Sequence, residues 1–310
     1  HLCDRRQRQM CIRDRNQTNE VFSPLSGKAT YSETENELTV KAKNHTFIFS
    51  KRDGQLKGVS VNNHKISFAN GPRFIGARRA DRSLDQFYNH DDEKAKEKDR
   101  TYSEFPDAAV FTKLEVKEDG GNLIVTANYK LGNLDKAQWT INPNGEAALD
   151  YTYNFSGVVD LIGISFDYPE DQVISKRWLG AGPYRVWQNR IHGTQYDVWE
   201  NDYNDPIPGE TFTYPEFKGY FDSVSWMNIR TKEGTISLTN ETPDSYIGVY
   251  QPRDGRDRLL YTLPESGISV LDVIPPVRNK VNSTDLCGPS SQPKWVNGPQ
   301  TGRIIFRFME

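Results

Sequence analysis

The feature that most constrains the fold is a series of short segments in which apolar and polar residues alternate. Residues 38–42 alternate strictly, and residues 46–49 form a short apolar run before the turn signal Asp53-Gly54. Alternation with a period of two is the pattern of a strand that buries one face. No sustained helical period occurs along the chain, so the sequence predicts an all-β protein built as a large antiparallel sandwich.

The predicted strands are separated by glycine, proline and asparagine and are distributed over most of the chain. They lie at residues 38–42, 46–49, 56–61, 65–68, 110–116, 123–127, 136–141, 147–155, 163–166, 223–230, 235–238, 247–250, 258–261, 268–273 and 303–308. The charge-dense residues 81–104 are predicted to form an exposed loop. Neither a repeat nor a linker divides the strands, so we predict one domain over residues 36–310.

The N-terminal segment differs in texture from the rest. Residues 1–15, HLCDRRQRQMCIRDR, lack the apolar stretch of a signal peptide, and MCIRDR resembles translated sequencing-adapter read-through. We therefore expect residues 1–15 to be a non-native lead and residues 16–35 to be a linker or the end of a preceding domain. On this expectation the chain is a fragment of a longer protein.

Charge and cysteine content exclude several classes of function. The formal net charge is −3 with no basic patch, which argues against nucleic-acid binding. No apolar run approaches the ~20 residues of a membrane-spanning helix. Of the three cysteines, two lie in the N-terminal lead, and no regular calcium-loop spacing is present. We predict no metal site and no cofactor.

Aromatic residues concentrate in two segments, residues 177–199 and 214–226. Aromatic faces over sugar C–H surfaces, with polar side chains bonding to hydroxyls, are typical of carbohydrate sites, although packing in a β core also explains such rings. Trp178 and Trp226 follow strand patterns and are predicted to be core residues. The Gly-x-Gly-Pro turn predicts an exposed loop after it, and the candidate substrate-binding residues there are Arg185, Trp187, Asn189, Arg190 and His192.

Four motifs occur in an order that resembles the C-terminal β-sandwich of family-two glycoside hydrolases, the β-galactosidase small-chain domain. They are HTFIFSKRDGQLKGVSVNNHKI (45–66), GPRFIGARRAD (71–81), WLGAGP (178–183) continuing to residue 190, and PEFKG (215–219) with VSW (224–226). The resemblance covers roughly residues 36–310. It implies a galactose-mutarotase-like supersandwich and a periplasmic or exported setting.

The resemblance also implies a division of labour. In this family the catalytic glutamates lie on an upstream TIM barrel, so no catalytic residue is assigned in this chain. The loop DLCGPSSQPKW (285–295) resembles the family segment that reaches the catalytic pocket, which makes Trp295 a further substrate-binding candidate. Arg185 stands where the family usually has Glu, which suggests an acidic sugar as a hypothesis.

Two functional classes follow. The first is a C-terminal domain that binds carbohydrate and shapes the active-site rim of a β-galactosidase-like hydrolase, with the upstream catalytic domain of the same polypeptide as its partner. The second is a stand-alone carbohydrate-binding or mutarotase-like protein, for which His192 is the residue of interest. A lyase of the same superfamily is a third and weaker alternative.

Overall fold

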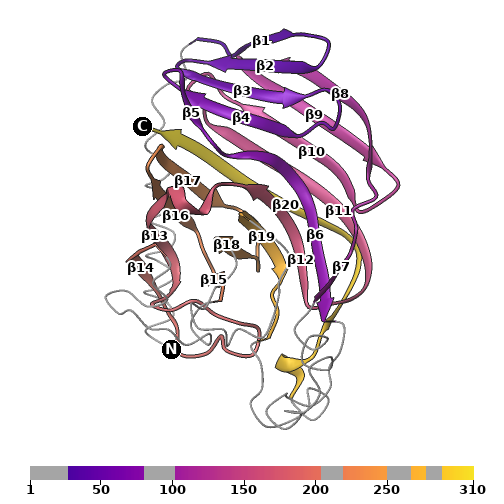
Figure 1. The fold of residues 1–310 in the computed structure, drawn as a ribbon, viewed down its shortest axis with the longest axis vertical. Coiled ribbons are helices and arrows are strands. Elements are labelled where there is room, and N and C mark those ends of the chain that lie inside the picture. Colours follow the sequence, from indigo (N-terminus) through magenta and orange to yellow (C-terminus); the bar gives the residue numbers. More distant parts are fainter. Residues whose placement is uncertain (1–26, 80–101, 204–218, 250–266, 277–287) are drawn as a thin grey trace.

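The computed structural model describes residues 27–79, 102–203, 219–249, 267–276 and 288–310, and every structural statement below concerns these segments. Their strands form two antiparallel sheets that pack face to face as a sandwich (Figure 1). The described residues contain two single-turn 3-10 helices, η1 (Glu170–Gln172) and η4 (Pro289–Ser291). Neither of these is a candidate for crossing a membrane. The predicted all-β, two-layer fold is therefore confirmed.

The first sheet has the strand order β1-β2-β3-β4-β6-β12-β19-β18-β15, with β5 paired to β4 and β7 paired to β6. Its strands are β1 (Thr30–Glu33), β2 (Glu37–Ala42), β3 (His45–Ser50), β4 (Leu56–Val61), β5 (His64–Ile66), β6 (Ala69–Arg79), β7 (Tyr102–Glu104), β12 (Leu161–Asp167), β15 (Phe221–Asp222), β18 (Tyr246–Val249) and β19 (Ile268–Val273).

The second sheet has the strand order β14-β13-β16-β17-β20-β11-β10-β9-β8. Its strands are β8 (Val110–Asp119), β9 (Asn122–Lys130), β10 (Leu134–Ile141), β11 (Ala147–Val159), β13 (Val173–Gly182), β14 (Gln195–Asp202), β16 (Trp226–Thr231), β17 (Gly234–Asn240) and β20 (Lys294–Met309). The long strand β20 runs from beside η4 to the C-terminus (Figure 1).

Aromatic side chains from the two sheets interlock at the centre of the sandwich. Phe166 of β12 stacks on Phe68 at 4.6 Å between ring centroids and meets Phe306 of β20 edge-on at 5.5 Å. Trp139 of β10 contacts the same Phe166 ring at 6.0 Å. A Cβ at Gly71 would lie 2.3 Å from the Phe166 ring, so β6 needs glycine at that position. Burial of these large rings supplies much of the driving force for joining the sheets.

The strand predictions agree well with the observed strands. Every predicted strand that falls inside the described segments overlaps an observed one, whereas the prediction at residues 258–261 lies outside them. Most of the predicted loop at residues 81–104 also lies outside, and its last three residues form β7. The first sheet extends N-terminal of residue 36, because β1 pairs with β2. The strands that were not predicted are β1, β6, β7, β13, β14 and β15.

Candidate functional site

The Gly-x-Gly-Pro motif forms the end of strand β13. This strand lies between β14 and β16, so its backbone is paired on both sides. Trp178 is fully buried, meets the ring of Phe221 edge-on at 4.9 Å, and donates its indole N–H to the carbonyl of Ala181 at 3.1 Å. A Cβ at Gly182 would lie 2.5 Å from the ring of Trp199. The prediction that Trp178 is a core residue is confirmed, and the second glycine is required by the neighbouring ring.

The chain after Pro183 packs into the protein interior, whereas the sequence predicted an exposed loop. Val186 exchanges two backbone hydrogen bonds with Tyr220, each 2.8 Å long. The indole of Trp187 is only 2% exposed and packs edge-to-face on Tyr220 at 5.7 Å. Arg185 is 3% exposed, with its guanidinium 5.8 Å from the centroid of the Phe221 ring. The structure thus buries two of the candidate ligand contacts, and their role in substrate binding stays a prediction.

The same loop is tied to the distal segment that resembles the family's pocket-reaching loop. The side-chain amide of Gln188 donates to the carbonyl of Gln292 at 2.7 Å, and its backbone N–H donates to the carbonyl of Pro275 at 3.0 Å. Asn189 donates to the hydroxyl of Ser291 in η4 at 3.2 Å. Residues about 100 positions apart in sequence are therefore held together at one end of the sandwich.

Three candidate residues are accessible near these contacts. Arg190 and His192 are exposed, and the hydroxyl of Tyr184 donates to the carbonyl of His192 at 3.0 Å, which holds the turn. Trp295 is 68% exposed at the start of β20, where its register partner is Val158 of β11. Of the six residues predicted from sequence, Arg190, His192 and Trp295 are exposed, Asn189 is half-buried, and Arg185 and Trp187 are buried.

Trp226 lies on the outer face of the second sheet, so the prediction that it is a core residue was wrong. Its neighbour Met227 is fully buried, and strand alternation turns Trp226 to the opposite face. There the guanidinium of Arg177 lies 6.0 Å from the centroid of the indole. The adjacent Ser225 shares a 2.5 Å hydrogen bond with the hydroxyl of Tyr196.

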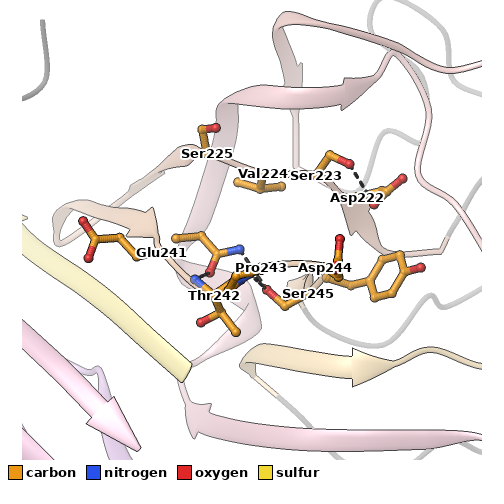
Figure 2. Close-up of a pocket in the computed structure, with 11 residues that line it drawn as sticks. Asp222, Ser223, Val224, Ser225, Glu241, Thr242, Pro243, Asp244 and Ser245 are labelled. Atoms are coloured by element: carbon orange, nitrogen blue, oxygen red, sulfur yellow. Dashed lines mark hydrogen bonds between the residues drawn. The ribbon is translucent and has the colours of Figure 1, made fainter. Parts of the chain in front are cut away.

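Sequence reasoning missed a polar pocket of about 310 Å³ beside this region (Figure 2). Its lining residues are Asp222, Ser223, Val224, Ser225, Asn240, Glu241, Thr242, Pro243, Asp244, Ser245 and Tyr246. Burial, and secondarily the negative charge of Asp244, raises the pKa of Asp222. Burial followed by the charges of both aspartates raises the pKa of Tyr246. Because serine, threonine and aspartate in short connections also mark ordinary turns, composition offered no signal for this pocket.

Within the described segments, no group of three or more histidine, cysteine, aspartate and glutamate side chains is arranged to hold a metal ion. The polar groups of this pocket and of the loop after Pro183 can instead form hydrogen bonds with hydroxyl-rich or charged organic ligands. The prediction that the protein uses no cofactor is not tested by this structure.

Comparison with known proteins identifies the family. Residues 41–268 match the model of the family described as "Beta galactosidase small chain". No curated protein sequence matches the chain. Among solved structures, a galactose 1-epimerase from Lactobacillus acidophilus is 9% identical and has a TM-score of 0.49, with 92% of this chain and 99% of that chain covered.

Two further structures are similar in the same range. A galactose mutarotase-like protein from Lactobacillus casei is 10% identical, has a TM-score of 0.42, and is matched over 90% of this chain and 99% of its own. An α-N-acetylgalactosaminidase from Bifidobacterium bifidum is 12% identical, has a TM-score of 0.41, and is matched over 88% of this chain and 36% of its own. The family model spans most of the described sandwich, and the chain belongs to the β-galactosidase small-chain family.

Proposed function

We propose that this chain is a carbohydrate-binding β-sandwich domain of a β-galactosidase-like glycoside hydrolase. It forms part of the active-site rim, while the catalytic glutamates lie on a separate TIM-barrel domain of the same polypeptide. The observation that carries the proposal is the position of Trp295. The exposed Trp295 lies four residues after Ser291. The hydroxyl of Ser291 accepts a hydrogen bond from Asn189, which belongs to the loop after the Gly-x-Gly-Pro motif.

The chemistry at this end of the sandwich fits a sugar ligand. An exposed indole offers an apolar face for the C–H surface of a pyranose ring. The Arg190 guanidinium and the His192 imidazole are exposed on the loop after the Gly-x-Gly-Pro motif, and they can donate hydrogen bonds to sugar hydroxyls. Two buried residues anchor this loop to the interior. Arg185 packs on the ring of Phe221, and Trp187 packs on the ring of Tyr220.

The position of Arg185 bears on the sugar class. The hypothesis of an acidic sugar requires its guanidinium to reach a ligand carboxylate, but this group is buried over an aromatic ring. We therefore propose neutral galactoside-type oligosaccharides as the ligand class. Binding of uronate-containing oligosaccharides in preference to neutral ones would contradict this choice.

The proposal is tested by isothermal titration calorimetry of the full chain with a panel of neutral oligosaccharides. Trp295→Ala should abolish measurable binding, because the stacking surface is removed. Tyr31→Ala is the matched control, since Tyr31 is also an exposed aromatic residue but lies on the edge strand β1. Equal binding by the wild-type chain and Trp295→Ala would show that the indole is not the platform.

The accessible His192 keeps the stand-alone mutarotase-like function as a second candidate. An exposed imidazole is a suitable general base or acid for anomer interconversion. Polarimetry on freshly dissolved galactose separates the two functions. Interconversion above the buffer rate that is lost in His192→Ala would favour the second candidate over the first.

A further inference from the structure

The polar pocket of Figure 2 lies where two connections cross between the sheets. Residues 223–225 lead from β15 in the first sheet to β16 in the second, and residues 241–245 lead from β17 back to β18. The backbone N–H of Asn240 donates to the carbonyl of Ser225 at 2.9 Å, which holds the connections together. The resulting cavity of about 310 Å³ is at the small end of ligand pockets, so it suits a single ring.

The two ends of the cavity differ in charge. At one end Glu241 is neutralised by Arg303, with 3.1 Å between Oε2 and Nε. At the other end Asp222 and Asp244 approach each other from the two connections (Figure 2). Among the described residues no cation pairs with either aspartate, and the hydroxyl of Ser223 donates to Asp222 at 3.1 Å. This end of the cavity therefore holds two carboxylates that no described cation neutralises.

The remaining lining is suited to hydroxyl groups. The Asn240 side-chain amide donates to the hydroxyl of Ser245 at 2.9 Å, and that hydroxyl donates to the carbonyl of Thr242 at 3.0 Å. Asn240 therefore keeps a second N–H donor, and Ser245 keeps acceptor capacity. The hydroxyl of Tyr246 has no hydrogen-bond partner among the described residues, and burial keeps its pKa raised, so it remains a donor at neutral pH. A polyhydroxylated ring would meet both donors and acceptors along this wall.

The charged end selects among such rings. A neutral occupant would remove water from Asp222 and Asp244 and would strengthen the repulsion between them. A protonated amine placed between the two carboxylates would offset that repulsion and form charge-assisted hydrogen bonds. The cost of desolvating the two carboxylates, set against the gain from charge-assisted hydrogen bonds, favours a cationic group at this end. Hydroxyl groups suit the rest of the cavity.

We propose that this cavity binds one amino sugar, with its ammonium group between Asp222 and Asp244 and its hydroxyls against Asn240, Ser245 and Tyr246. The site is distinct from the Trp295 end and does not rest on the proposed function. It would give the chain a second carbohydrate contact with a charge preference that the first lacks.

Calorimetric titration of the full chain at neutral pH with galactosamine, galactose and ethanolamine tests this proposal. Galactosamine should bind about tenfold more tightly than galactose, which lacks the cation, and than ethanolamine, which lacks the ring. Asp222→Asn and Asp244→Asn should each weaken galactosamine binding about tenfold and leave galactose binding unchanged. Asp119→Asn, at the exposed end of the edge strand β8, is the matched control.

Folding of the variants is checked by thermal unfolding. Asp244 has a positive φ of 54°, a conformation that asparagine also tolerates, so Asp244→Asn keeps the turn. Removing one charge relieves repulsion, and both variants should unfold at temperatures no lower than the wild type. Equal affinity for galactose and galactosamine, unchanged galactosamine binding in both variants, or no binding of galactosamine to the wild type would each overturn the proposal.

Discussion

Replacing Trp187 and Trp295 in turn should produce opposite patterns of stability and binding. Trp187 is 2% exposed and packs edge-to-face on Tyr220. Removing a buried Trp side chain costs about 3–5 kcal/mol, of which the aromatic pair accounts for about 0.5–1.5 kcal/mol. Trp295 is 68% exposed, so Trp295→Ala should change the free energy of unfolding by no more than about 0.5 kcal/mol.

Urea unfolding of the purified chain, followed by far-UV circular dichroism, measures these differences. Trp187→Phe is a useful intermediate variant, because it retains a ring against Tyr220 and should lose less stability than Trp187→Ala. A loss below about 1 kcal/mol for Trp187→Ala would refute the reasoning, because such a small cost belongs to surface residues. It would mean that Trp187 is accessible in solution and would restore its role as a direct ligand contact.

Three other substitutions test separate parts of the structure. Gly163→Ala should disrupt the β12–β19 ladder, because its Cβ would lie 2.1 Å from a backbone carbonyl oxygen of β19, whereas Gly58→Ala meets open space and should be neutral or slightly stabilising in thermal unfolding. Burial raises the pKa of Asp272, so the wild type loses stability as the pH rises from about 3.8 through that raised pKa. Asp272→Asn lacks this loss, and its stability relative to the wild type should be higher at pH 7 than at pH 4 in urea titrations. Gln188→Ala leaves the Gln292 carbonyl without its side-chain donor and should cost about 1–3 kcal/mol, with faster amide hydrogen exchange in residues 288–295 as the local readout.

Alternation of apolar and polar residues was sufficient to predict most of the sandwich. Strands such as β2 and β10 bury every second residue, and this pattern is visible in the sequence. Strand β13 lacks such alternation, because it is central in its sheet and nearly all of its residues are buried. Its glycines also suggested a loop, whereas they are required by neighbouring atoms, as Gly182 is by the ring of Trp199.

The candidate site was predictable only in part. The sequence pointed to the loop after Pro183, but it could not tell which rings of that loop face the interior. That distinction depends on Tyr220 and Phe221, which arrive from a distant segment and cover Trp187 and Arg185. The pocket between residues 222–225 and 240–246 was not predictable, since it arises from two sheet-crossing connections that only the tertiary fold brings together.

The burial of Trp187 gives the Gly-x-Gly-Pro motif a structural role that is separate from ligand contact. Its strand is fixed by two neighbours, its loop is anchored on Tyr220, and the loop in turn holds Ser291 through Asn189. Trp295 lies at the start of β20, a strand that is paired with β11 and β17 in the second sheet. An exposed ring on a flexible segment would lose conformational freedom on binding, but one held by this chain of contacts loses less. In the proposed function these contacts would preorganise Trp295, and Ser291→Ala, which weakens the Asn189–Ser291 contact, should then lower the affinity for sugar.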